Sequence, residues 1–399
     1  MDALPAGLSQ APSEVPSLGT RFLVYPQAPF VPGYEDPDVI WISMPPGSIG
    51  AGPADHRMYV VDPIGAKAPY QRPYFPPWTG ALHPPAEPDP EGHFDHLPTN
   101  SRQFAAAHAY ACVRRVLSIS ESYLGREVPW FFSPTYERLE IVPRLSWTNA
   151  QSGYGFLELG EDDSREEPFP YALNFDVIAH ETGHLILFGV LGIPERRTPS
   201  AEFLAYHEFV ADFLSLICLL HFDSALDKIL RRTRGNLFVP NELDRVAELV
   251  DERQIRMASH SLKLSDVGRE VHDLSRPFVG GLFDSLLEIH QLLLLERDLA
   301  SLDTRSIRSV REDLSQTEIE RELAVSRRDY EIRHFTIKSA LEEARDLIGE
   351  ALVRSWMDVD PETFSFRQAA NAILDRMEEG RGQRFVDRVY ANLAWRELL

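Results

Sequence analysis

The chain has 399 residues, of which 44% are hydrophobic and 25% are charged. An intrinsically disordered chain would be poorer in apolar residues and richer in charge, so this composition indicates a folded protein with a large core. The formal net charge of −21 argues against nucleic acid and membrane surfaces as partners, because both are anionic and repel an acidic protein.

The first 98 residues are rich in proline and are expected to form an arm. Runs such as 72–78 (RPYFPPW) and 83–92 (HPPAEPDPEG) block helices and favour extended or turn conformations. We predict loops, short strands at 38–43 and 58–62, and an arm (residues 1–98) that packs on the domain after it. A partly disordered arm is the alternative, mainly for the first 18 residues.

Residues 99–230 combine helical and strand patterns and are expected to form an α/β lobe. Apolar residues recur at helical spacing from 101 to 124, with Asn100 or Ser101 as the N-cap. The acidic stretch 160–167 (GEDDSREE) is typical of a solvated loop. Short strands are expected at 130–132, 139–142 and 155–159, and two apolar helices at 175–190 and 201–222.

Residues 231–399 are expected to form a helical lobe. The stretch 286–354 is long and carries opposite charges near i,i+4 spacing, which is typical of exposed helices. Within it, residues 296–337 are expected to form an inserted helical hairpin.

Two observations bear on where the protein acts. Its first 20 residues have neither a basic segment nor a continuous apolar run, so they do not form a secretory signal. The most apolar long stretch, 203–222, contains His207, Glu208 and Asp212, which excludes a membrane span. We expect a cytoplasmic protein, with secretion by another route as the alternative.

A metal-binding motif lies in the first of the two apolar helices. His180, Glu181 and His184 form HExxH, and residues at i and i+4 share one helix face, so both imidazoles can bind one metal ion. Glu181 is one residue from His180 and lies beside the metal, where it can take a proton from water. The alternative is a pair of ordinary core histidines on an apolar helix.

A third ligand is expected from the second apolar helix. Position 190 is Val190, which excludes the class that has a third histidine there. Glu208 and Asp212 instead lie one turn apart among apolar residues, where unpaired acids would be costly to bury. A zinc site explains why both acids are there. Glu208 would be the third ligand, and Asp212 would accept the free ring N–H of a zinc-binding histidine. The competing ligands are His207 and Glu202.

These motifs resemble those of the thermolysin-like zinc metallopeptidases, which are of the gluzincin type. Asn149 and Ala150 are similar to the family's edge strand, whose asparagine and alanine backbone hold an extended substrate. Val271–Ser275 resembles the VHxxS segment, and this resemblance implies that His272 stabilises the oxyanion.

The resemblance implies an α+β, two-lobe zincin fold. It has a small mixed or antiparallel sheet in one lobe, a mainly helical C-terminal lobe, and the active-site helix between them. The implied function is a zinc-dependent endopeptidase that acts on peptide or protein substrates, with Zn²⁺ as the cofactor. The alternatives are a zinc-stabilised interaction protein without catalysis, and a metallohydrolase of a non-peptide amide or ester.

The sequence departs from the family at three places. The acidic calcium cluster has no counterpart, so we expect no calcium site. The family's active-site tyrosine is missing from its place, and Tyr206 is the nearest substitute. The arginine that binds the substrate carbonyl remains open between Arg245, Arg256 and Arg276.

Overall fold

The computed structural model describes residues 19–162, 168–239, 241–246, 256–299, 307, 315, 317–318 and 327–399. It is a mixed α+β fold with small sheets and long helices. The strands are β1 (Thr20–Val24), β2 (Asp38–Ile42), β3 (Met58–Val60), β4 (Leu139–Val142), β5 (Ala150–Gly153), β6 (Phe156–Leu159), β7 (Glu161–Asp162), β8 (Phe169–Pro170), β9 (Arg245–Val246) and β10 (Arg256–Met257). The helices are α1 (Arg102–Leu124), α2 (Phe175–Val190), α3 (Ala201–Leu219), α4 (Asp223–Thr233), α5 (Val271–Glu296), α8 (Arg327–Ser355), α9 (Phe366–Glu379) and α10 (Val386–Trp395).

The four-stranded sheet is mixed and ends in an edge strand. Its order is β3-β4-β6-β5. The pairs β3–β4 and β4–β6 are parallel, whereas β5 and β6 form an antiparallel hairpin. Parallel neighbours need a crossover, and α1 supplies it between β3 and β4. Within the described part of the chain, β5 pairs on one side only, so its other edge is open.

The N-terminal arm shares the core of the residues that follow it. The hairpin of β1 and β2 packs on α1, and β3 belongs to the four-stranded sheet. The backbone N–H of Tyr25 donates to Nε2 of His108 at 3.0 Å, and Nε2 of Gln27 donates to Oδ1 of Asp176 at 3.1 Å. Apolar burial and these bonds tie the arm to α1 and α2.

A buried polar cluster joins the proline-rich loop to the outer face of the sheet. The side chains of Glu140 and Glu158 are fully buried on β4 and β6. Glu158 pairs with Lys67 and accepts hydrogen bonds from the backbone N–H of Tyr70 (2.8 Å) and from Nε2 of Gln151 (2.7 Å). Because Gln151 belongs to β5, this cluster also anchors the edge strand.

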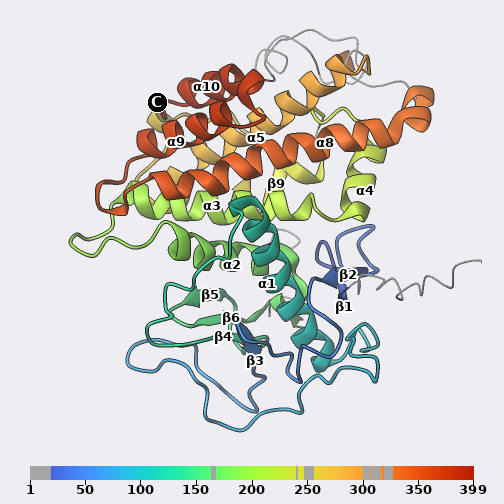
Figure 1. The fold of residues 1–399 in the computed structure, drawn as a ribbon, viewed down its shortest axis with the longest axis vertical. Helices are drawn as coiled ribbons and strands as arrows, with labels where there is room; N and C mark the ends of the chain where they lie inside the picture. The colour runs from blue at the N-terminus through green and yellow to red at the C-terminus, as the bar shows by residue number, and fades with distance from the viewer. Residues whose placement is uncertain are drawn as a thin grey trace, which may run out of the picture.

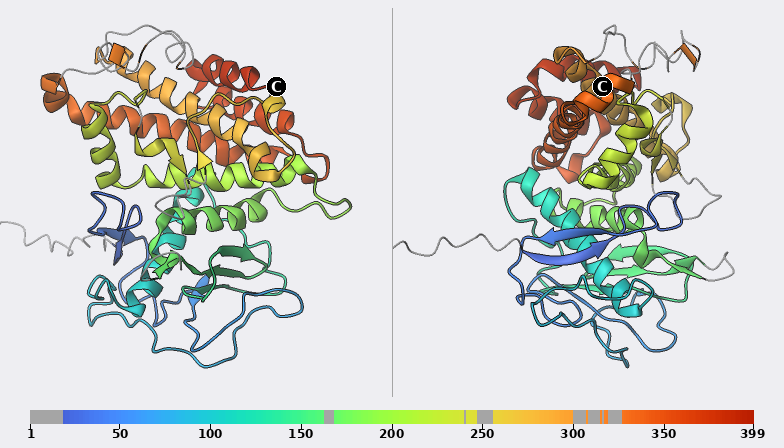
Figure 2. Two further views of the ribbon diagram at one scale, coloured as in Figure 1. Left: turned by 180° about the vertical axis from the view of Figure 1, so that it is seen from behind. Right: turned by 90° about the vertical axis from the view of Figure 1, so that its right-hand side faces the viewer.

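The helices α2, α3 and α5 pack in succession away from the sheet, with α2 nearest to it (Figures 1 and 2). Side chains cap the first two: Asn174 accepts from the N–H groups of the first turn of α2, and Ser200 does so for α3. Both helices are apolar on most of their surface, as expected for helices covered on several sides.

Two local predictions differ from the structure. Residues 130–132 were expected to form a strand but enter a turn, in which Ser133 N–H donates to the carbonyl of Trp130 at 3.0 Å. Their apolar side chains reflect burial of Trp130 and Phe132, not strand pairing. The acidic stretch is not a solvated loop at its start, because Asp162 is buried in β7, which pairs with β8. Its residues 163–167 lie outside the described part of the chain.

Two other expectations concern segment boundaries. Residue 230, expected to end the α/β lobe, falls inside α4. The expected hairpin at 296–337 lies largely outside the described residues, although α8 begins at Arg327.

One helix in the described ranges, α5, has the length and composition of a membrane span, and so does the pair of α3 and α4 if it is counted as one broken span. The most apolar stretch of α5 is 89% buried within the protein, and α3 and α4 meet at an 86° bend. Burial inside the fold explains the apolar character of α5, which packs against α3, α8 and α10.

A buried carboxyl on α5 predicts an unusual pH dependence of stability. Burial raises the pKa of Glu288 from 4.5 to about 7, despite hydrogen bonds from the backbone of Ile307 and from Asn392. The folded protein therefore keeps a proton that the unfolded chain loses, and stability decreases as pH rises from about 4.5 to about 7. This loss amounts to at most about 3 kcal/mol.

We expect Glu288→Gln to remove this dependence, because the amide stays neutral at every pH. Urea unfolding at about pH 5 and about pH 8 gives the free energy of unfolding for both proteins, and other titrating groups cancel in the comparison. The difference between the two pH values should be smaller in the variant. If the free energy of unfolding changed equally with pH in the variant and the wild type, Glu288 would not be the cause of the dependence.

Candidate metal site

Two packed helices bring three candidate ligands together. His180 and His184 lie one turn apart on α2, and Glu208 faces them from α3. The Nε2 atoms of the two histidines are 3.2 Å apart. Glu208 places one carboxylate oxygen 3.7 Å from Nε2 of His180 and the other 3.8 Å from Nε2 of His184. One ligand atom from each of the three lies within 4.8 Å of the others.

This donor set fits a zinc ion. Two nitrogens bound to one tetrahedral Zn²⁺ at about 2.0–2.1 Å lie about 3.4 Å apart, close to the separation of the two imidazoles. Burial and the neighbouring His180 both lower the pKa of His184, which favours the neutral imidazole that a metal requires. Burial raises the pKa of Glu208, but its hydrogen bond to His272 and the nearby histidines outweigh burial and lower it overall.

Asp212 orients the first histidine. Its Oδ1 is 2.8 Å from Nδ1 of His180, and its side chain is fully buried one turn after Glu208. A carboxylate at this distance holds the proton on Nδ1, which leaves the lone pair of Nε2 on the side of Glu208. The structure therefore brings Asp212 and His180 into direct contact.

Glu181 lies next to the three ligands but is not one of them. It follows His180 on α2, and its Oε2 accepts a hydrogen bond of 2.9 Å from the hydroxyl of Ser152. Ser152 belongs to the edge strand β5, so the strand and the helix fix this carboxylate from both sides. We had not predicted Ser152, although it shares a strand face with Ala150, two residues earlier.

His272 lies at the beginning of α5 and reaches the same cluster. Its Nδ1 is 2.9 Å from an oxygen of Glu208, and its side chain is 47% exposed. The N-terminus of the helix is capped by Glu270, which accepts from the N–H groups of His272 and Asp273. The contact with Glu208 was not predicted, because no sequence pattern indicates how closely α5 approaches α3.

The cluster opens into a cleft of about 460 Å³ between α2 and β5. Asn149 and Ala150, expected to hold the substrate, line the cleft from the edge-strand side. Gln151 and Ser152 continue this wall, and Val177 and Phe188 belong to the opposite wall on α2. The cleft therefore combines an open strand edge with acidic and imidazole side chains.

The structure places the remaining candidates elsewhere. Tyr206 is buried in the core against Phe209 and Phe278, so it does not take the place of a catalytic tyrosine in the cleft. The carboxylate of Glu202 accepts the backbone N–H of Phe366 at 2.7 Å. His207 packs against the ring of Phe188, outside the ligand group.

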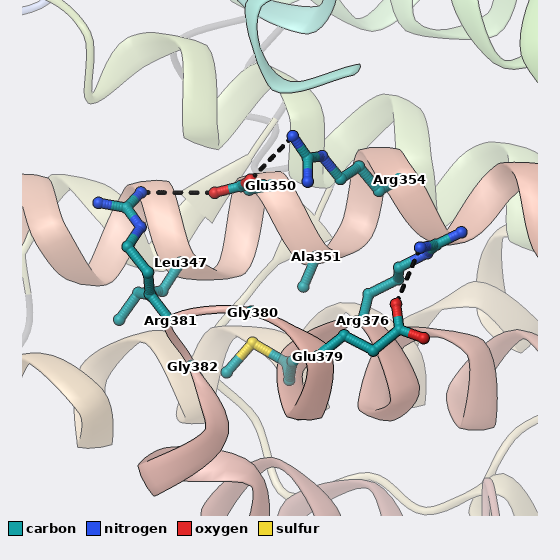
Figure 3. Close-up of a pocket in the computed structure, with 10 residues that line it drawn as sticks. Leu347, Glu350, Ala351, Arg354, Arg376, Glu379, Gly380, Arg381 and Gly382 are labelled. Atoms are coloured by element: carbon teal, nitrogen blue, oxygen red, sulfur yellow. Dashed lines mark hydrogen bonds and ion pairs between the residues drawn. The ribbon is translucent and has the colours of Figure 1, made fainter. Parts of the chain in front are cut away.

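A second hollow, of about 170 Å³, lies between α8 and α9 (Figure 3). Its arginines pair with its own carboxylates: Glu350 contacts both Arg354 and Arg381, and Arg376 contacts Glu379. Arg376 also pairs with Asp358 at 2.6 Å beside the hollow, so each of these arginines has a carboxylate partner.

Comparisons of the sequence with known proteins give little support for any particular function. No protein-family model matches the chain, and no curated protein matches it in sequence. Among solved structures it is similar to the precursor of protealysin, a metalloproteinase from Serratia proteamaculans, with a TM-score of 0.42 and 12% identity. That match covers 85% of this chain and 86% of the other. The functional interpretation therefore depends on the geometry of the residues in this chain.

Proposed function

We propose that this protein is a zinc-dependent endopeptidase of the thermolysin-like type, acting on peptide or protein substrates. The observation that carries the proposal is the convergence of His180, His184 and Glu208 in the cleft, with Glu181 beside them. A cluster that only stabilised the fold would not need the carboxylate of Glu181 beside its three converging side chains. The two-lobe arrangement, with α2 at the junction, is part of this proposal.

The three converging side chains would hold the ion. When bound, Zn²⁺ would supply a Lewis acid that polarises the scissile carbonyl and increases the acidity of water. Asp212 keeps His180 in the tautomer that a ligand needs.

The chain's own groups would move the proton and hold the substrate. Glu181, oriented by Ser152, would take a proton from the attacking water and pass it to the leaving amine. His272 would donate a hydrogen bond to the negative charge that develops on the substrate oxygen. The backbone of Ala150, on the open edge of the sheet, would pair with an extended peptide, and Asn149 lines the cleft beside it.

Zinc content tests the ligand set directly. We expect the purified protein to hold about one Zn²⁺ per chain and Glu208→Ala to lose most of it, because two imidazoles alone bind zinc weakly. Elemental analysis after dialysis measures both. Glu202→Ala is the matched control, since it removes a carboxylate from the same helix outside the cluster, and it should keep its zinc.

Two results would contradict the proposal. Wild-type protein without a transition metal would exclude the zinc site. Fully zinc-loaded protein that cleaves nothing in a broad peptide library would exclude the peptidase and favour a zinc-stabilised interaction protein.

A further inference from the structure

One aromatic residue in the wall of the cleft packs against a chain of two further aromatic side chains. Phe188, on the last turn of α2, lines the cleft. The ring of Phe131 lies 5.1 Å from that of Phe188 and 5.6 Å from that of Tyr154. We call Phe131, Tyr154 and Phe188 the aromatic ridge. They come from a turn, the β5–β6 hairpin and α2, which are far apart in the sequence.

Tyr154 of the aromatic ridge is partly exposed but is braced by its neighbours. Tyr154 is 37% exposed, and its hydroxyl is 3.0 Å from that of Thr135. The ring of Tyr136 packs on Tyr154 at 5.8 Å and also covers Gly155. A Cβ on Gly155 would come within 2.5 Å of that ring, and its φ of +91° also favours glycine. A preformed apolar surface loses less entropy when it binds a ligand than one that must first be ordered.

The ridge reaches one end of the cleft through Phe188, and its Tyr154 directly follows the open edge strand. Ser152 of β5 contacts Glu181 of α2 midway along it. Tyr154 follows β5 by one residue, and Phe188 follows His184 by one helical turn, so β5 and α2 both run towards the ridge. Asn149 and Val177 line the other end. A peptide paired with β5 must therefore pass the ridge on one side of the bond to be cut.

The direction of pairing decides which side of the substrate meets the ridge. Antiparallel pairs are more stable and more frequent than parallel ones. An antiparallel peptide runs opposite to β5, so its N-terminal part lies beside Tyr154. At about 3.3 Å per residue, the side chain at the ridge belongs to a residue about two or three positions before the cleaved bond.

We propose that the aromatic ridge is a specificity subsite that selects substrates with an aromatic or large aliphatic residue about two or three positions N-terminal to the cleaved bond. This inference rests on the proposed peptidase function and adds to it the class of peptide that the site accepts. The occupant is an apolar substrate side chain, because the ridge consists of aromatic rings and adjoins the cleft that also holds Glu181.

The first experiment is cleavage profiling with a mixed peptide library, using the full-length, zinc-loaded protein. Wild type should prefer Phe, Tyr, Leu or Met at that position. Tyr154→Ala and Phe131→Ala should lower kcat/KM for such peptides by about tenfold to a hundredfold, the range for burying one large apolar side chain. For peptides with Gly at that position, the same two variants should have nearly the kcat/KM of the wild type. Tyr154→Phe keeps the ring and should keep the preference, and Tyr390→Ala, an exposed tyrosine on α10, is the matched control.

A second experiment separates the subsite from catalysis. Glu181→Gln protein binds without cleaving, so fluorescence anisotropy can compare a labelled alanine-rich peptide with the same peptide carrying one Phe. The Phe peptide should bind about tenfold more tightly, and adding Tyr154→Ala should remove the difference. Thermal unfolding confirms that each variant is folded.

The outcomes are distinct for the two proposals. Cleavage without any N-terminal preference, or a preference that survives in Tyr154→Ala and Phe131→Ala, would overturn the subsite and leave the peptidase standing. A preference only on the C-terminal side would also overturn it. If wild type cleaves nothing, the peptidase proposal fails, and equal binding of the two peptides would then refute the subsite as well.

Discussion

Glu181→Gln should lower peptide turnover by at least about a hundredfold while the fold and the zinc content stay unchanged, because the amide cannot accept a proton from the attacking water. The substitution keeps the size of the side chain, and Ser152 can still hydrogen-bond to the amide oxygen. Glu181 is not among the three converging ligands, so its loss should not release the metal. The measurement is kcat on a peptide cleaved by the wild type, with zinc content determined on the same samples.

Two further variants test whether the loss of turnover is specific to Glu181. Glu378→Gln makes the same chemical change on an exposed face of α9, and its activity should equal that of the wild type. His272→Ala should lose less than Glu181→Gln, about tenfold to a thousandfold, because it removes one donor to the developing charge and leaves the base intact. Near wild-type activity in Glu181→Gln would mean that another group takes the proton, and the proposed mechanism would be wrong.

The cluster of His180, His184 and Glu208 could be predicted from the sequence largely because it depends on local spacing. His180 and His184 share a helix face by their i,i+4 separation, and this holds in any α-helix. Predicting Glu208 required a longer inference. Two acids in an apolar helix would be costly to bury unpaired, so a partner for them was expected. The structure brings these side chains to within 4.8 Å because α2 and α3 pack directly on each other.

Other parts of the cleft depend on tertiary packing that no local pattern encodes. The contacts of Ser152 with Glu181 and of His272 with Glu208 join segments far apart in the chain. Tyr206 illustrates the opposite error: it lies close to the ligands in sequence, but the helical period turns it into the core. The sequence predicts a strand at Phe131, whereas a turn brings its ring against that of Phe188, which lines the cleft.

Lys67→Met should reduce the free energy of unfolding by about 3–5 kcal/mol, the range for removing one partner of a buried ion pair. The side chain of Lys67 is 1% exposed and that of its partner Glu158 is fully buried. Without the ammonium group, Glu158 would keep only hydrogen bonds from Tyr70 and Gln151 to offset its buried charge. Urea unfolding monitored by circular dichroism gives the free energy directly.

Two controls test whether the buried charge causes the loss. Lys338→Met makes the same substitution where Lys338 pairs with the exposed carboxylates of Asp223 and Asp227, and it should cost less than about 1 kcal/mol. Adding Glu158→Gln to Lys67→Met removes the unpaired charge, so the double variant should be more stable than Lys67→Met alone. Equal losses in Lys67→Met and Lys338→Met would show that the ion pair does not hold the proline-rich loop on the sheet. Because Glu158 also anchors Gln151 of the edge strand, Lys67→Met should in addition weaken peptide binding at temperatures where the protein remains folded.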